Sequence, residues 1–127
     1  MSAIVLIVDD NESNVAVIRT ILLARGYEVR IARDGWSAIE SVQQRRPDVI
    51  LLDVMMPGPD GMQVLDRLKL DPKTTSIPVI MVTRKTEDQD VLAGYENGAD
   101  YYITKPFTGR QLLYAIGRVL GGAEATE

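Results

Sequence analysis

The chain has 127 residues, a hydrophobic fraction of 46%, a charged fraction of 25% and a formal net charge of -4. This length and composition predict one ordinary globular domain, and the negative charge argues against a nucleic-acid-binding surface on it. Cysteine and histidine are both absent from the sequence, which excludes disulfides, thiolate or imidazole metal sites, and catalysis by a Ser-His-Asp or Cys-His group.

Short apolar segments predict strands. The run 49–53 is bounded by Pro47 and Pro57, so it is too short for a helix and is typical of a strand buried on both faces. Segment 27–32 instead alternates apolar and charged residues, which predicts a strand with one wetter face at the edge of a sheet. The predicted strands are 3–8, 27–32, 49–53, 77–82 and 100–104.

Apolar residues at helical spacing, with capping residues before them, predict a helix after each strand. Two of these helices open with a capping-box pattern, Thr86-x-x-Gln89 and Thr108-x-x-Gln111. The predicted helices are one that begins near Asn11 or Ser13 and ends at Gly26, 35–45, one between Asp60 and Asp71, 86–96 and 108–120.

Strands that alternate with helices predict an α/β fold, a doubly wound parallel sheet with helices on both faces. The flavodoxin-like form of this fold has the strand order 2-1-3-4-5. We expect the domain to span residues 1–121 and residues 122–127 to be a frayed tail or the stub of a linker. No segment is long and apolar enough to cross a membrane or to act as a signal sequence, so we expect a cytoplasmic protein.

Polar residues follow the predicted strands at the edge where open α/β folds bind their ligands. Because the first and third strands are neighbours in this order, Asp9, Asp10 and Asp53 share one small volume. Three carboxylates so close repel one another, so either one takes up a proton or a cation neutralises them. Ligands that are all oxygen favour a hard cation, and Mg²⁺ is the usual choice beside phosphate.

Thr83 and Lys105 end the fourth and fifth strands at the same edge. A threonine hydroxyl and a lysine ammonium complete a site that can hold a phosphoryl group, with Asp53 as the nucleophile. An aspartyl phosphate is an established covalent intermediate of this kind.

Taken together, these residues resemble the receiver domain of two-component response regulators. The resemblance covers Ile4 to about Leu120 and rests on five motifs in order. They are Asp9-Asp10, Asp53, Met56-Pro57-Gly58 with Asp60-Gly61, Thr83, and Lys105-Pro106-Phe107.

The resemblance implies that a histidine kinase or a phosphotransfer protein phosphorylates Asp53. It also implies that Asp10, Asp53 and the backbone carbonyl of Met55 hold Mg²⁺, with Asp9 contributing through water. Lys105 would pair with the phosphoryl group, and the Lys105–Pro106 peptide would be cis. Thr83 would move toward the phosphoryl group, and Tyr102 matches the aromatic position that follows it.

On this interpretation the protein is a switch and not an enzyme, since it assists only its own phosphorylation and dephosphorylation. The face formed by 86–96, 100–104 and 108–120 would change shape and control a downstream protein or an output domain. The same face could support dimerisation, although the residues do not require it. The sequence fits both a single-domain regulator and a fragment of a larger regulator or hybrid kinase.

Arg84 departs from the small residue that is common after the threonine in this family. Together with Met55 and Lys85 it is expected to alter the lifetime of the acyl phosphate, in a direction the sequence does not give. Three other classes of protein share parts of the pattern: a flavin- or nucleotide-binding module, an aspartate-nucleophile phosphohydrolase, and a degenerate receiver used only for binding. A flavin or nucleotide module needs a phosphate-binding loop after the first strand, where this chain has the acidic pair Asp9-Asp10. A phosphohydrolase of this type carries a second acid two residues after the nucleophile, where this chain has Met55. A degenerate receiver would lack site residues, and all five are present here.

Overall fold

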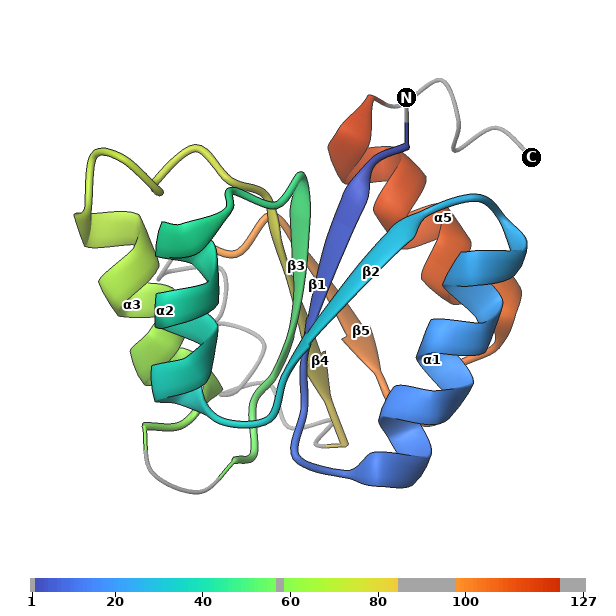
Figure 1. The fold of residues 1–127 in the computed structure, drawn as a ribbon. Helices are drawn as coiled ribbons and strands as arrows, with labels where there is room; N and C mark the ends of the chain where they lie inside the picture. Colours follow the sequence, from blue (N-terminus) through green and yellow to red (C-terminus); the bar gives the residue numbers. More distant parts are fainter. Residues whose placement is uncertain (1, 57–58, 85–97, 122–127) are drawn as a thin grey trace.

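A parallel sheet of five strands in the order β2-β1-β3-β4-β5 forms the centre of the molecule, as predicted (Figure 1). The computed structural model describes residues 2–56, 59–84 and 98–121. All four strand pairs in the sheet are parallel. The strands are β1 (Ile4–Val8), β2 (Glu28–Ala32), β3 (Val49–Asp53), β4 (Val79–Thr83) and β5 (Tyr101–Thr104).

The described helices cover both faces of this sheet. Figure 1 shows α1 and α5 on one side of the strands and α2 and α3 on the other. Their bounds are α1 (Glu12–Ala24), α2 (Gly35–Gln44), α3 (Gly61–Leu70) and α5 (Gly109–Leu120). The predicted helix 86–96 with its capping box, and the predicted tail 122–127, lie outside the described residues. None of the described helices is long and apolar enough to span a membrane.

The apolar core divides into two clusters, one on each face of the sheet. One cluster packs β-strand residues against Val15, Ile18 and Leu22 of α1 and against α5. The other packs the opposite face of the same strands against α2 and α3. Strands β3 and β4 are buried along their whole length and contribute alternate residues to both clusters. Burial of each large aliphatic side chain favours folding by about 1.5–3 kcal/mol, so the central strands are held from both sides.

Each of the four described helices has a capped N-terminus at the carboxyl edge of the sheet. Asn11 and Asp34 accept hydrogen bonds from backbone N–H groups of α1 and α2. The predicted capping box at Thr108 is present at the start of α5. A second box, Asp60 with Gln63, opens α3 and was not predicted. Each cap stabilises its helix by about 1 kcal/mol and fixes where the preceding loop ends.

Strand β4 begins two residues later than the sequence predicted. Pro78 has no N–H to donate to a ladder, so it stands before the strand and only its carbonyl accepts, from the Ile50 N–H at 3.0 Å. At the other end the strand continues through Thr83. Thr83 is therefore a ladder residue, and its backbone is fixed by its neighbours.

Candidate functional site

The three carboxylates predicted to converge do so. Asp9 and Asp10 follow β1 directly and Asp53 ends β3, and these two strands are paired with Val8 opposite Leu52. One carboxylate oxygen from each of the three residues lies within 4.8 Å of the others. Asp9 and Asp53 are buried, with 2% and 7% of their surface exposed, whereas Asp10 is exposed. The cluster is therefore open to solvent on the Asp10 side.

Lys105 reaches this cluster from the end of β5. Its Nζ lies 3.1 Å from Asp9 Oδ2 and 3.6 Å from Asp53 Oδ2, and its side chain is only 11% exposed. The nearer partner is thus Asp9, which the sequence did not predict. A single ammonium cannot balance three carboxylates, so the site attracts a further cation or a proton. The peptide bond between Lys105 and Pro106 is cis, as the resemblance implied.

Asp53 is the carboxyl group whose protonation is most affected by this arrangement. The pKa of Asp53 is raised from 3.8 to about 6; burial is the largest cause, and the negative charge of Asp9 acts in the same direction. The ammonium of Lys105 and the N–H of Met55, which donates to Asp53 Oδ1 at 3.3 Å, act in the opposite direction. At neutral pH the group is therefore mainly ionised, although its charge lies in a poorly solvated position.

Thr83 and Tyr102, the two residues predicted to form the switch, lie on the same face of the sheet. Side chains alternate along a strand, and Met81, two residues before Thr83, belongs to the cluster that α2 and α3 cover. Tyr102 pairs with Met81 across β4 and β5 and packs against the same cluster. Thr83 is fully buried, and Tyr102 is half-buried. Both side chains therefore lie on the face that α2 and α3 cover.

Gly61 is a site residue for which the pattern of residues predicted no role. Its N–H donates to the Val54 carbonyl at 3.0 Å, so the first residue of α3 lies directly against the end of β3. A Cβ at this position would overlap the backbone carbonyl of Asp53 and approach the Val54 Cα at 2.7 Å. Only glycine allows this contact. A glycine directly after a helix-capping aspartate was the signal in the sequence.

The positions predicted to alter the lifetime of the phosphoryl group are exposed where the structure describes them. Met55 is 53% exposed. Arg84 is also exposed, whereas Lys85 lies outside the described residues. Their influence on the lifetime stays a prediction.

Comparison with known proteins assigns the chain to a family. The family description "response regulator receiver domain" matches residues 5–117 of the chain. The chain belongs to this family. As a receiver domain it is 47% identical over 116 residues to the response regulator PleD of Caulobacter vibrioides, and the match covers 91% of this chain. It is 38% identical over 112 residues, 88% of its length, to the DNA-binding response regulator MtrA of Mycolicibacterium paratuberculosis.

Solved structures give the same result for the fold of this receiver domain. The chemotaxis response regulator CheY4 of Vibrio cholerae superposes with a TM-score of 0.89 at 34% identity, over 94% of this chain and 100% of that one. By contrast, the chain spans only 26% of PleD and 48% of MtrA. The family resemblance and the flavodoxin-like topology are thus confirmed, and the relatives differ in what lies beyond the receiver domain.

Proposed function

We propose that this receiver domain is a phosphorylation-activated signalling switch that accepts a phosphoryl group on Asp53. The observation that carries the proposal is the contact of Asp53 with two further carboxylates and with the Lys105 ammonium at the carboxyl edge of the sheet. Such a group is a nucleophile that is ionised at neutral pH and has a cation beside it. A histidine kinase or a phosphotransfer protein is the phosphodonor that the family relationship suggests.

The residues at this edge fit Mg²⁺. Every side-chain ligand available is a carboxylate oxygen, and the three oxygens lie close enough together to bind one ion. Asp9, Asp10 and Asp53 would hold it, together with the backbone carbonyl of Met55. When bound, Mg²⁺ would supply the positive charge that allows carboxylates and phosphoryl oxygens to lie side by side.

The protein residues then have distinct tasks in phosphoryl transfer. A carboxylate oxygen of Asp53 forms a bond to phosphorus while the bond from phosphorus to the imidazole nitrogen of the donor breaks. Lys105 is released in part from Asp9 and binds the new phosphoryl oxygens, and the Thr83 hydroxyl donates a hydrogen bond to them. In this account the receiver domain is no enzyme, because its chemistry ends with its own modification and hydrolysis.

The output is a change of shape. Thr83 moves toward the phosphoryl group and Tyr102 follows into the space it leaves, so a partner that binds the new shape is favoured. The partner is a downstream protein or an output domain, and a second copy of the chain is compatible with the same face. Because the domain carries a net charge of -4, we propose that it does not bind nucleic acid itself, even though MtrA is a DNA-binding regulator. We place the protein in the cytoplasm, where histidine kinases present their phosphoryl groups.

Labelling with a small-molecule phosphodonor tests the proposal. Acetyl phosphate with Mg²⁺ should add one phosphoryl group to the wild-type protein, detected by intact mass, and none to Asp53→Ala. Asp66→Ala is a matched control, because Asp66 is an exposed aspartate on α3 outside the site. Label retained in Asp53→Ala, or absent from both the wild type and the control, would refute the assignment.

A further inference from the structure

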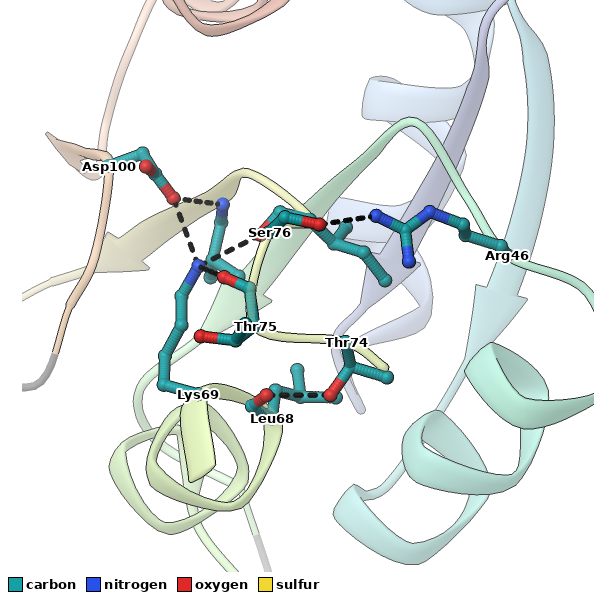
Figure 2. A network of polar contacts seen from close by, with 9 residues as sticks. Arg46, Leu68, Lys69, Thr74, Thr75, Ser76 and Asp100 are labelled. Carbon is teal, nitrogen blue, oxygen red and sulfur yellow. Dashed lines mark hydrogen bonds and ion pairs between the residues drawn. The ribbon is translucent and has the colours of Figure 1, made fainter. Parts of the chain in front are cut away.

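A network of polar contacts at the opposite edge of the sheet surrounds Lys69, the penultimate residue of α3 (Figure 2). Its ammonium donates to the carbonyls of Thr75 at 3.0 Å and Ile77 at 2.9 Å, and contacts Asp100 Oδ2 at 3.3 Å. An ammonium has three protons, so these acceptors use all of them. The side chain is 15% exposed, which marks it as a fixed structural group and not as a solvated lysine.

Asp100 joins this network to the start of two strands. Its N–H donates to the Val79 carbonyl at 2.9 Å, and its Oδ2 accepts from the Val79 N–H at 2.9 Å. These two hydrogen bonds link Val79, the first residue of β4, to Asp100, the residue before β5. Asp48 makes the same reciprocal pair with Ile4 at the start of β3 and β1. The aspartate before each strand therefore fixes which residues are opposite one another.

The turn at Gly98, before β5, packs against the side chain of Lys69. Gly98 has a φ of +97°, and a Cβ there would come within 3.1 Å of Lys69 Cγ. The apolar stem of Lys69 therefore supports the turn while its ammonium holds Asp100. We call Lys69, Asp100 and the groups they contact at Thr75, Ile77 and Val79 the Lys69 clamp.

The clamp matters most for β5. This strand has four residues and lies at the edge of the sheet with β4 as its one strand neighbour, whereas β3 is paired on both sides. A register shift of one residue moves a strand by roughly 3.3 Å and turns every side chain to the other face. Lys105 follows the last residue of β5, so its approach to Asp9 and Asp53 depends on that register.

We propose that Lys69 and Asp100 are positioning residues for phosphoryl transfer, acting from the edge opposite to the reaction. The clamp sets the register of β5 on β4 and so places Thr104 opposite Thr83, with the Lys105 nitrogen donating to the Thr83 carbonyl oxygen at 2.6 Å. The metal-binding carboxylates come from β1 and β3, which the clamp does not hold. Loss of the clamp therefore weakens phosphoryl transfer and leaves Mg²⁺ binding intact.

The experiment rests on the proposed function and compares five proteins, the wild type, Lys69→Met, Asp100→Asn, their double variant and a control, at a temperature at which circular dichroism shows each to be folded. Lys69→Met keeps the apolar stem and removes the ammonium, and Asp100→Asn keeps an oxygen for the Val79 N–H and removes the charge. Lys73→Met is the matched control, an exposed lysine in the same connection between α3 and β4. The measurements are the limiting rate of phosphorylation by acetyl phosphate at saturating Mg²⁺, and the Mg²⁺ dissociation constant.

We expect Lys69→Met to lower the limiting rate about tenfold, since misplacing a reacting group by one ångström can cost up to about a hundredfold. Asp100→Asn should act in the same direction, and the double variant should be no slower than Lys69→Met, because both changes break one clamp. The Mg²⁺ dissociation constant should stay within about twofold of wild type in all of them. Lys73→Met should match the wild type in both measurements.

A folded Lys69→Met or Asp100→Asn protein with the wild-type rate would overturn the inference. So would a rate and a Mg²⁺ affinity that fall by the same factor, since that would indicate general damage to the site. If Lys69→Met does not fold, the milder Asp100→Asn decides between these outcomes. A wild-type protein that takes no label would instead refute the proposed function, so the two failures are distinguishable.

Discussion

At the scale of single residues, the site depends on how three buried or half-buried groups share charge. Lys105 lies between Asp9 and Asp53 and is closer to Asp9. If Asp53 is the nucleophile, as we propose, the ammonium is held before the reaction more closely by Asp9 than by the nucleophile itself. In the proposed switch, phosphorylation of Asp53 adds acceptor oxygens that compete with Asp9 for the Lys105 ammonium, and this competition would draw β5 toward the site.

The raised pKa of Asp53 has a consequence for stability. Because burial raises this pKa to about 6 in the folded protein, the native state binds a proton that the unfolded chain has already lost between about pH 4 and pH 6. The free energy of unfolding of the Mg²⁺-free protein should therefore fall as the pH rises through this range. The contribution is fully present below about pH 4 and is lost above about pH 6.

Asp53→Asn tests this account of the charge. Replacing the carboxylate with a neutral amide should raise the free energy of unfolding at about pH 7.5 by about 1–3 kcal/mol, in the absence of Mg²⁺. It should also flatten the dependence of stability on pH between about 4 and 6. Urea unfolding of both proteins across this range is the measurement. A variant less stable than the wild type at the higher pH would contradict the assignment of burial as the main cause.

At the scale of elements, the site depends on how closely α3 approaches β3. Gly61 starts the helix against the backbone of Asp53 and Val54, and the Asp60–Gln63 capping box fixes the helix at that point. The Asp53 side chain and the Met55 carbonyl come from the same short stretch of chain. The position of the helix therefore determines the position of two of the proposed Mg²⁺ ligands.

Gly61→Ala should separate α3 from β3. The added methyl group overlaps the Asp53 carbonyl, so we expect a loss of about 2 kcal/mol or more in the free energy of unfolding. We also expect a Mg²⁺ dissociation constant at least about tenfold higher, the equivalent of about 1.4 kcal/mol. Chemical unfolding and Mg²⁺ titration followed by fluorescence of the single tryptophan measure the two effects.

Gly109→Ala is the matched control for this substitution. It also changes the first residue of a capped helix, but a Cβ there makes only ordinary contacts with the Ile21 side chain, the nearest at 3.6 Å. It should leave Mg²⁺ binding unchanged and should be neutral or stabilising by about 0.5–1 kcal/mol. Equal losses in the two variants would contradict the role given to Gly61.

The sequence predicted the elements well where local signals and tertiary packing agree. The apolar run 49–53 is a fully buried strand, and the capping box predicted at Thr108 opens α5. Strand ends were less accurate, because Ile77 is as buried as a strand residue although Pro78 keeps it out of the ladder. The convergence of Asp9, Asp10 and Asp53 followed from the strand order alone.

Two features of the structure, one in the site and one at the opposite edge of the sheet, could not be obtained from the pattern of residues. The preference of Lys105 for Asp9 depends on sub-ångström differences at the end of a side chain, which strand order does not determine. Lys69 is a lysine in a polar stretch near a helix end, and such residues are usually solvated. Its burial depends on the turn at Gly98, which comes 29 residues later in the chain.

At the scale of the whole molecule, Mg²⁺ should stabilise the fold. The three carboxylates belong to two different segments, so an ion that binds all of them binds the native state and not the unfolded chain. At a free concentration one hundred times its dissociation constant, Mg²⁺ should add about 2.7 kcal/mol to the free energy of unfolding. The midpoint of thermal unfolding should rise by roughly 10 °C.

Asp10→Asn is the variant that tests this linkage. Asp10 is the exposed member of the cluster, so its replacement should leave the metal-free stability within about 0.5 kcal/mol of wild type. The increase in the unfolding midpoint on addition of Mg²⁺ should be largely lost, and Ca²⁺ or high salt should not restore it. An undiminished increase in Asp10→Asn would show that the ion stabilises the protein elsewhere.

The division of the core into two clusters affects which parts of the surface can change when Thr83 and Tyr102 move. Thr83 and Tyr102 both belong to the side of the sheet that α2 and α3 cover, while α1 and α5 rest on a separate apolar cluster. Rearrangement of these two side chains would leave the packing beneath α1 unaltered. A kinase that docked along α1 would therefore contact the same atoms before and after it delivered its phosphoryl group. Binding of the phosphodonor and the change of shape at Thr83 and Tyr102 could then proceed independently.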